Sequence, residues 1–69
     1  MVEVFKTNVE AEQHAELLLE ELSKKFPEFR INFDLSDDDK ILRVEGATIC
    51  PETIVALMHS NSYDCEILN

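Results

Sequence analysis

Glycine, cysteine and long apolar runs are all scarce in this chain of 69 residues, which has one glycine, two cysteines and no tryptophan. A composition that is 45% hydrophobic with so little glycine is typical of a folded chain rather than a disordered one. Cys50 and Cys65 are too few for a disulfide framework and too far apart for a Cys-x-x-Cys zinc pair. No apolar stretch approaches the roughly 20 residues that a membrane-spanning helix needs. We expect one small domain covering residues 1–69.

Basic residues are the other shortage, because 6 lysines and arginines face 15 aspartates and glutamates, which gives a net charge of −9. This field repels phosphate backbones and anionic lipid headgroups, so we expect no nucleic-acid partner and no membrane partner. The start of the chain, Met1–Phe5, lacks the basic and apolar regions of a signal peptide. Reduced thiols also suit a reducing compartment. We therefore expect a cytoplasmic location.

Spacing at the start of the chain predicts a strand and then a helix. Val2 and Val4 share one face of an extended segment, which we expect to face inward while Phe5 faces outward. Thr7 or Asn8 is expected to cap the helix, because short polar side chains accept hydrogen bonds from free N–H groups. One apolar stripe then runs along this helix: Ala11, Ala15, Leu18, Leu22 and Phe26.

The rest of the chain predicts a hairpin, a second helix and a last strand. Apolar residues alternate with polar ones in segments 29–35 and 41–45, which predicts a half-buried hairpin. Pro51 suits the first position of a helix and makes Cys50 its N-cap. Residues 63–68 alternate again. The order β-α-β-β-α-β predicts a ferredoxin-like α+β fold, with an antiparallel four-stranded sheet and two helices on one face.

Four parts of the sequence resemble the heavy-metal-associated domain of copper chaperones and metal-pumping ATPases. Ala15, Leu18 and Leu22 match the small and branched apolar positions of the family's first helix. Residues 26–29 (Phe-Pro-Glu-Phe) are similar to the family's Leu-Pro-Gly-Val turn, and residues 50–55 (Cys-Pro-Glu-Thr-Ile-Val) to its Ser-Pro-Glu-Glu-Ile-Val helix start. Residues 62–68 (Ser-Tyr-Asp-Cys-Glu-Ile-Leu) resemble its Gly-Tyr-Asp-Ala-Glu-Val-Leu ending. The resemblance covers nearly the whole chain and implies the same ferredoxin-like fold.

The family carries Met-x-Cys-x-x-Cys before its first helix, and alignment on that motif places Val9 at the methionine, Ala11 at the first cysteine and His14 at the second. Soft cations such as Cu(I) need thiolate or thioether ligands, and Ala11 supplies neither. The resemblance thus implies a vacant site, with no metal and no cofactor expected. Weak residual binding of a heavy metal through His14, with a chaperone-like role, is an alternative.

Catalytic apparatus is not visible in the sequence, which has no nucleophile–base–acid set and no glycine-rich phosphate loop, so we expect no enzyme activity. Cys50 is a candidate reactive thiol, since the dipole and free N–H groups of a helix N-terminus stabilise a thiolate. A thiol redox role at Cys50 is a second alternative, although a structural thiol is the plainer interpretation. Asp37, Asp38 and Asp39 are expected to form a solvated turn.

A few apolar residues are not assigned to the predicted core. Phe5 and Ile41, facing outward on neighbouring strands, would form a spot on the open sheet face beside Arg43, and Leu17 lies off the helix stripe. Contiguous exposed apolar residues indicate a contact surface. The sequence therefore predicts a non-enzymatic protein-interaction module of unknown role, which binds an unknown protein partner or pairs as a homodimer.

Overall fold

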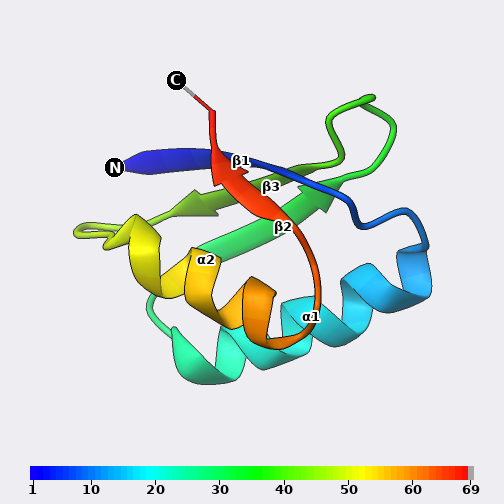
Figure 1. The fold of residues 1–69 in the computed structure, drawn as a ribbon. Coiled ribbons are helices and arrows are strands. Elements are labelled where there is room, and N and C mark those ends of the chain that lie inside the picture. The colour runs from blue at the N-terminus through cyan, green and yellow to red at the C-terminus, as the bar shows by residue number, and fades with distance from the viewer. Residues whose placement is uncertain (69) are drawn as a thin grey trace.

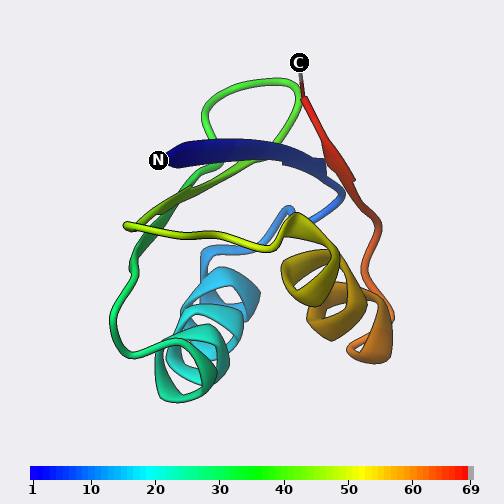
Figure 2. The same cartoon turned by 90° about the vertical axis from the view of Figure 1, so that its left-hand side faces the viewer.

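The computed structural model describes residues 1–68 and contains six elements in the predicted order (Figure 1). They are β1 (Val2–Thr7), α1 (Glu12–Lys25), β2 (Arg30–Asp34), β3 (Ile41–Glu45), α2 (Pro51–Ser60) and β4 (Cys65–Ile67). The strands form one antiparallel sheet in the order β2-β3-β1-β4. Both helices cover the same face of this sheet and leave the other face open (Figure 2). The predicted ferredoxin-like α+β fold is confirmed.

The β2–β3 hairpin confirms the alternation seen in the sequence. Its register pairs Phe33 with Leu42 and Ile31 with Val44. Cross-strand partners share a face of the sheet, so these four side chains all face the helices. Leu42 and Val44 are fully buried because β3 is a central strand, whereas Ile31 and Phe33 are half-buried because β2 is an edge strand.

The first strand faces the opposite way from the prediction. Phe5 is fully buried and Val2 is 47% exposed, so the prediction of an outward-facing Phe5 is wrong. Phe5 pairs with Leu42, which places both under the helices. The same inward row continues through Thr7 to Val9, and both are buried. Two alternations compete in this segment, and the one that contains the aromatic ring removes more apolar surface from water.

Helix α1 also begins later than predicted. Ala11 is its N-cap and Glu12 its first residue, so neither Thr7 nor Asn8 caps it. Thr7 still belongs to β1, and Asn8 makes its hydrogen bonds to another loop, so neither polar side chain is free for the helix. Within residues 1–68, neither helix combines the length and the apolar character that crossing a membrane requires.

The core lies between the sheet and the two helices. Its largest fully buried side chains come from four elements and the loop after β1: Phe5, Leu22, Leu42, Ile54, Met58, Val9 and Val44. At one end, Phe29 stacks on Phe26 with the ring centroids 5.4 Å apart. A Cβ atom at Gly46 would lie 2.5 Å from Cδ1 of Phe29, so any other residue where the chain leaves β3 would force the Phe29 ring or the local backbone to shift.

Candidate functional site

The segment between β1 and α1 contains the positions that the family resemblance assigns to a metal site. The Thr7 hydroxyl donates to the Lys40 carbonyl and accepts a hydrogen bond from the Val9 N–H at 3.2 Å. Asn8 Oδ1 accepts from the Asp64 backbone N–H at 2.8 Å, and Asn8 Nδ2 donates to the Asp64 carboxylate at 3.3 Å. The segment is thus tied to the β2–β3 turn and to the loop before β4 by bonds that need no metal.

None of the three motif positions offers a thiol or thioether. Val9, at the methionine position, is fully buried in the core. Ala11 and His14 lie at the start of α1 as predicted, with Ala11 half-buried and His14 exposed. The His14 ring lies beside Tyr63, with 6.3 Å between the ring centroids. Residues 1–68 contain no group of three His, Cys, Asp or Glu side chains that could hold a metal ion.

Cys50 is the N-cap of α2, as predicted, and its thiol is exposed. The thiol donates to the Glu52 carboxylate, with Sγ 3.3 Å from Oε2. The pKa of Glu52 is lowered, first by the hydrogen bond from its own backbone N–H and then by this thiol. Reactive cysteines need the thiolate and usually lie beside cationic groups. The neighbour that the fold gives Cys50 is instead a carboxylate.

A hollow of about 680 Å³ lies between the C-terminal half of α1 and α2. It is lined by Glu21, Lys24, Lys25, Thr53, Ala56, Leu57 and Ser60. Its two hydroxyls are engaged with backbone carbonyls, because Thr53 donates to Cys50 O and Ser60 donates to Leu57 O, each at 2.7 Å. The hydroxyls therefore serve the local structure of α2.

The acidic turn between β2 and β3 uses its carboxylates to fix its own backbone. Asp34 Oδ1 accepts hydrogen bonds from the Ser36 hydroxyl and the Ser36 N–H, and these two bonds lower the pKa of Asp34. Asp37 Oδ1 accepts from the Asp39 N–H at 2.9 Å. Lys40 then closes the turn with a positive φ of 49°. Asp37 is exposed and Asp39 is half-buried, in keeping with the predicted hairpin turn.

The open face of the sheet carries a different apolar group from the predicted one. The register places Ile41 and Arg43 outward as predicted, but Phe5 lies in the core, so the expected Phe5–Ile41 spot does not form. Val4 takes its place, because it pairs with Arg43 and shares its face. The Leu68 N–H donates to the Val4 carbonyl at 2.8 Å and extends the pairing beyond β4.

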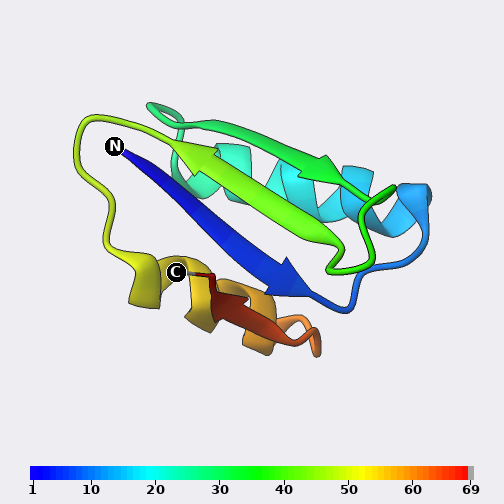
Figure 3. The same ribbon diagram turned by 90° about the horizontal axis from the view of Figure 1, so that it is seen from above.

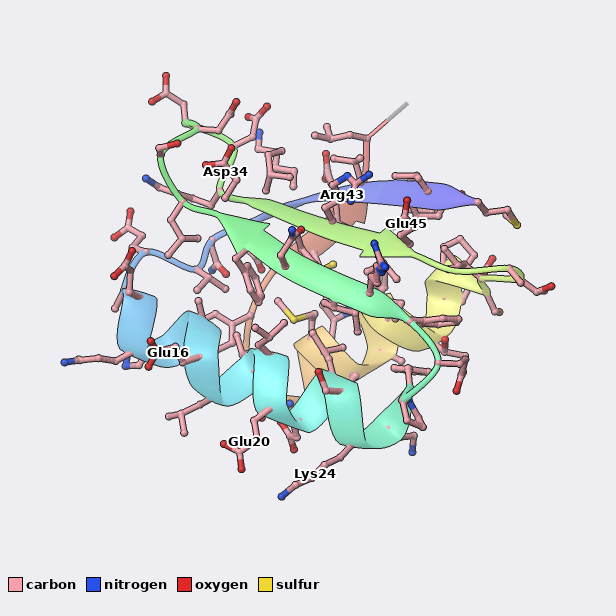
Figure 4. All side chains as sticks on the ribbon, turned by 180° about the vertical axis from the view of Figure 1, so that it is seen from behind. Glu16, Glu20, Lys24, Asp34, Arg43 and Glu45 are labelled. Carbon is pink, nitrogen blue, oxygen red and sulfur yellow. The ribbon has the colours of Figure 1, made fainter. Side chains whose placement is uncertain are left out.

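Charges on the open face balance. Six charged strand residues share this face by register, three basic and three acidic: Lys6, Arg30, Arg43, Asp34, Glu45 and Glu66. Arg43 and Glu45 form an ion pair at 3.7 Å. The rest of the chain holds the other 12 of 15 acidic and 3 of 6 basic side chains. Figure 4 shows Glu16 and Glu20 on α1, on the opposite side of the sheet from Arg43 and Glu45.

Leu17 is 66% exposed on α1, as predicted. It borders a hollow of about 200 Å³ together with His14 and Tyr63. The sheet separates this hollow from Ile41 and its neighbours, because the helices lie on the covered face. The residues predicted as candidates for an interaction surface therefore occupy three places: the core, the open face and the helix layer.

No protein-family model matches the sequence, and no curated protein sequence matches it either. The resemblance to the heavy-metal-associated domain therefore stays a prediction.

Sequence reasoning missed three residues around the metal-motif segment and the second helix. Thr7, Val9 and Ile49 are all buried. The alternation from Phe5 through Thr7 to Val9 was the signal for the first two. Ile49 directly precedes the N-cap of α2, where an apolar residue commonly packs back against its helix.

Proposed function

We propose that this protein is a non-enzymatic protein-interaction module built on a heavy-metal-associated-type domain that has lost its thiolate site. Its contact surface is the open face of the sheet around Val4, Ile41 and Leu68. The observation that carries the proposal is the composition of that face. It combines outward apolar side chains with balanced charge, whereas the rest of the chain is strongly acidic.

The charge distribution favours contact through this face. The acidic side chains of the helix layer repel acidic proteins and are strongly hydrated, so they resist burial. On the open face, an approaching protein meets no net charge from the strand side chains and can bury apolar atoms. The partner expected from this chemistry is a protein surface with an apolar centre and a rim of mixed charge.

Affinity capture with the immobilised chain tests the proposal. Ile41→Thr keeps a β-branched residue in β3 but removes apolar surface, so a specific partner should bind at least ten-fold more weakly. Leu17→Gln is the matched control, because it removes exposed apolar surface from α1, and binding should be unchanged. Thermal unfolding verifies that both variants remain folded. Equal losses for the two variants would contradict the assignment to the open face.

Metal titration tests the alternative role at His14. A single exposed imidazole holds a metal weakly, so the proposal expects no tight binding of Zn²⁺, Cu(I) or Ni²⁺. Binding at about 1 µM or tighter that His14→Ala abolishes would replace the proposed function with metal binding.

A further inference from the structure

The sheet has two edge strands, β2 and β4, which lie on opposite sides of the β1–β3 pair (Figure 3). β4 has only three residues, whereas β2 has five and none of them is proline. In the part of the chain that the structure describes, no strand pairs with the outer side of β2. Outer N–H and C=O groups of such an edge are available to a further strand.

The sequence around β2 is complementary to itself. An inward row of half-buried apolar residues is packed on the core: Phe29, Ile31, Phe33 and Leu35. The outward row between them reads Arg30, Asn32 and Asp34, all exposed. Rotation by 180° about Asn32 exchanges the basic end of the outward row with its acidic end. The same rotation superimposes apolar positions on apolar positions.

We propose that β2 pairs with β2 of a second copy of this chain, antiparallel and about a two-fold axis at Asn32. Arg30 then lies opposite the partner's Asp34, and Asp34 lies opposite the partner's Arg30. On the inward side, Ile31 lies opposite the partner's Phe33. The pairing joins two four-stranded sheets into one continuous sheet with the helices of both copies on the same side.

Only this register places both Arg30 and Asp34 opposite a residue of opposite charge. A shift by two residues leaves Arg30 opposite asparagine or serine, and a shift by four places Arg30 opposite arginine or Asp34 opposite aspartate. A shift by one residue is excluded for another reason, because it would set the inward row of one copy against the outward row of the other. The pairing is therefore specified by the strand sequence itself.

Both charged residues of the proposed ion pair, Arg30 and Asp34, are exposed and have atoms available for it. Arg30 is exposed on the outward row, and the structure gives it no salt bridge within residues 1–68. Ser36 lowers the pKa of Asp34, so Asp34 is ionised at neutral pH. Both Ser36 bonds use Oδ1 of Asp34, which leaves Oδ2 to accept from an arginine.

Apolar side chains at this edge are also only partly buried. A hollow of about 260 Å³ between α1 and β2 is lined partly by Ala15, Leu19, Phe33 and Leu35. An added strand beside β2 would place its inward side chains over the mouth of this hollow. The half-buried inward row would then be shielded on both sides, as in a central strand.

Acidic residues on α1 oppose the pairing. Glu12 and Glu16 lie at the rim of the same hollow, and each copy carries a net charge of −9. Salt at about 0.15 M screens exposed charges beyond about 8 Å, so directly opposed pairs outweigh the distant repulsion there. Dimerisation should therefore be measured at physiological ionic strength.

Sedimentation equilibrium over a concentration series tests the proposal. Arg30→Asp and Asp34→Arg each set like charges opposite one another on both sides of the axis. Each variant alone should dimerise at least ten-fold more weakly than the wild type, which corresponds to about 1.4 kcal/mol. Mixed in equal amounts, the two variants are complementary again, and the mixture should recover an affinity near that of the wild type.

Two controls separate this pairing from other effects. Asp38→Arg changes the net charge as much as Asp34→Arg, but in the exposed turn, and should leave dimerisation unchanged. Ile41→Thr on the open face should also leave it unchanged, so failure here is distinct from failure of the proposed function. Circular dichroism verifies the fold of each variant. A monomeric wild type, a dimer insensitive to both charge reversals, or a mixture no heavier than its components would overturn the proposal.

Discussion

The two faces of the sheet carry similar apolar side chains that differ in their burial. Phe5 and Leu42 face the helices and are fully buried, whereas their chain neighbours Val4 and Ile41 face outward and are half-buried. Successive residues of a strand point to opposite faces of the sheet. A shift of this alternation by one residue therefore changes which side chains enter the core. The difference teaches that burial follows register, and that an apolar residue by itself does not predict its own environment.

Charge separates the same two sides of the molecule. Strand residues on the open face carry balanced charge, while the helix layer and loops hold most of the acidic residues. The acidic layer favours solubility and opposes association. The open face and the edge strand β2 thus remain as the surfaces where contact with another protein meets the least repulsion.

The largest expected contrast between the covered face and the open face concerns stability. Leu22 is fully buried, and Leu22→Ala should lower the free energy of unfolding by about 2–5 kcal/mol, because it leaves a cavity in the core. Val2→Ala, at an outward position that is 47% exposed, should change it by no more than about 0.5 kcal/mol. Urea unfolding measures both, and similar losses would contradict the difference between the faces.

Local patterns in the sequence were sufficient for the hairpin and the second helix. Regular alternation in residues 29–35 and 41–45 has one consistent phase, and Pro51 fixes the start of α2. The first strand was different, because Val2 and Val4 support one phase, whereas Phe5 and Val9 support the opposite one, and packing against the helices selects the second. The fold was therefore predictable, while the orientation of β1 was not.

The candidate site was predictable only in part, for a related reason. The sequence placed Ala11 and His14 near the start of α1, where the structure has them, although the helix itself begins later than predicted, at Glu12. The cap was wrong, because Asn8 bonds Asp64, which lies 56 residues further along the chain. Such long-range hydrogen bonds leave no periodic signal in a single sequence.

A smaller effect is expected at Thr7, the buried polar residue of the covered face. Thr7→Val keeps the shape but removes the hydroxyl that donates to the Lys40 carbonyl and accepts from the Val9 N–H. The two backbone groups lose their partner, so unfolding free energy should fall by about 1–3 kcal/mol. Thr53→Val is the control, because its hydroxyl is exposed and water can replace it. Equal unfolding midpoints for the two variants would show that the Thr7 bonds contribute nothing.

The smallest effect on stability belongs to alkylation of Cys50, yet it gives a clear contrast with Cys65. Cys50 is exposed and should react in the folded protein, whereas Cys65 is buried and should react only after unfolding. Burial also raises the pKa of Cys65 from 9.0 to about 12, so the folded state holds the thiol proton more tightly than the unfolded state. Stability from this group is complete below pH 9.0 and is lost as the pH rises towards about 12. Mass spectrometry after timed alkylation, with and without denaturant, measures the contrast. Comparable rates for the two thiols in the native protein would place β4, and with it the covered face, in a different arrangement.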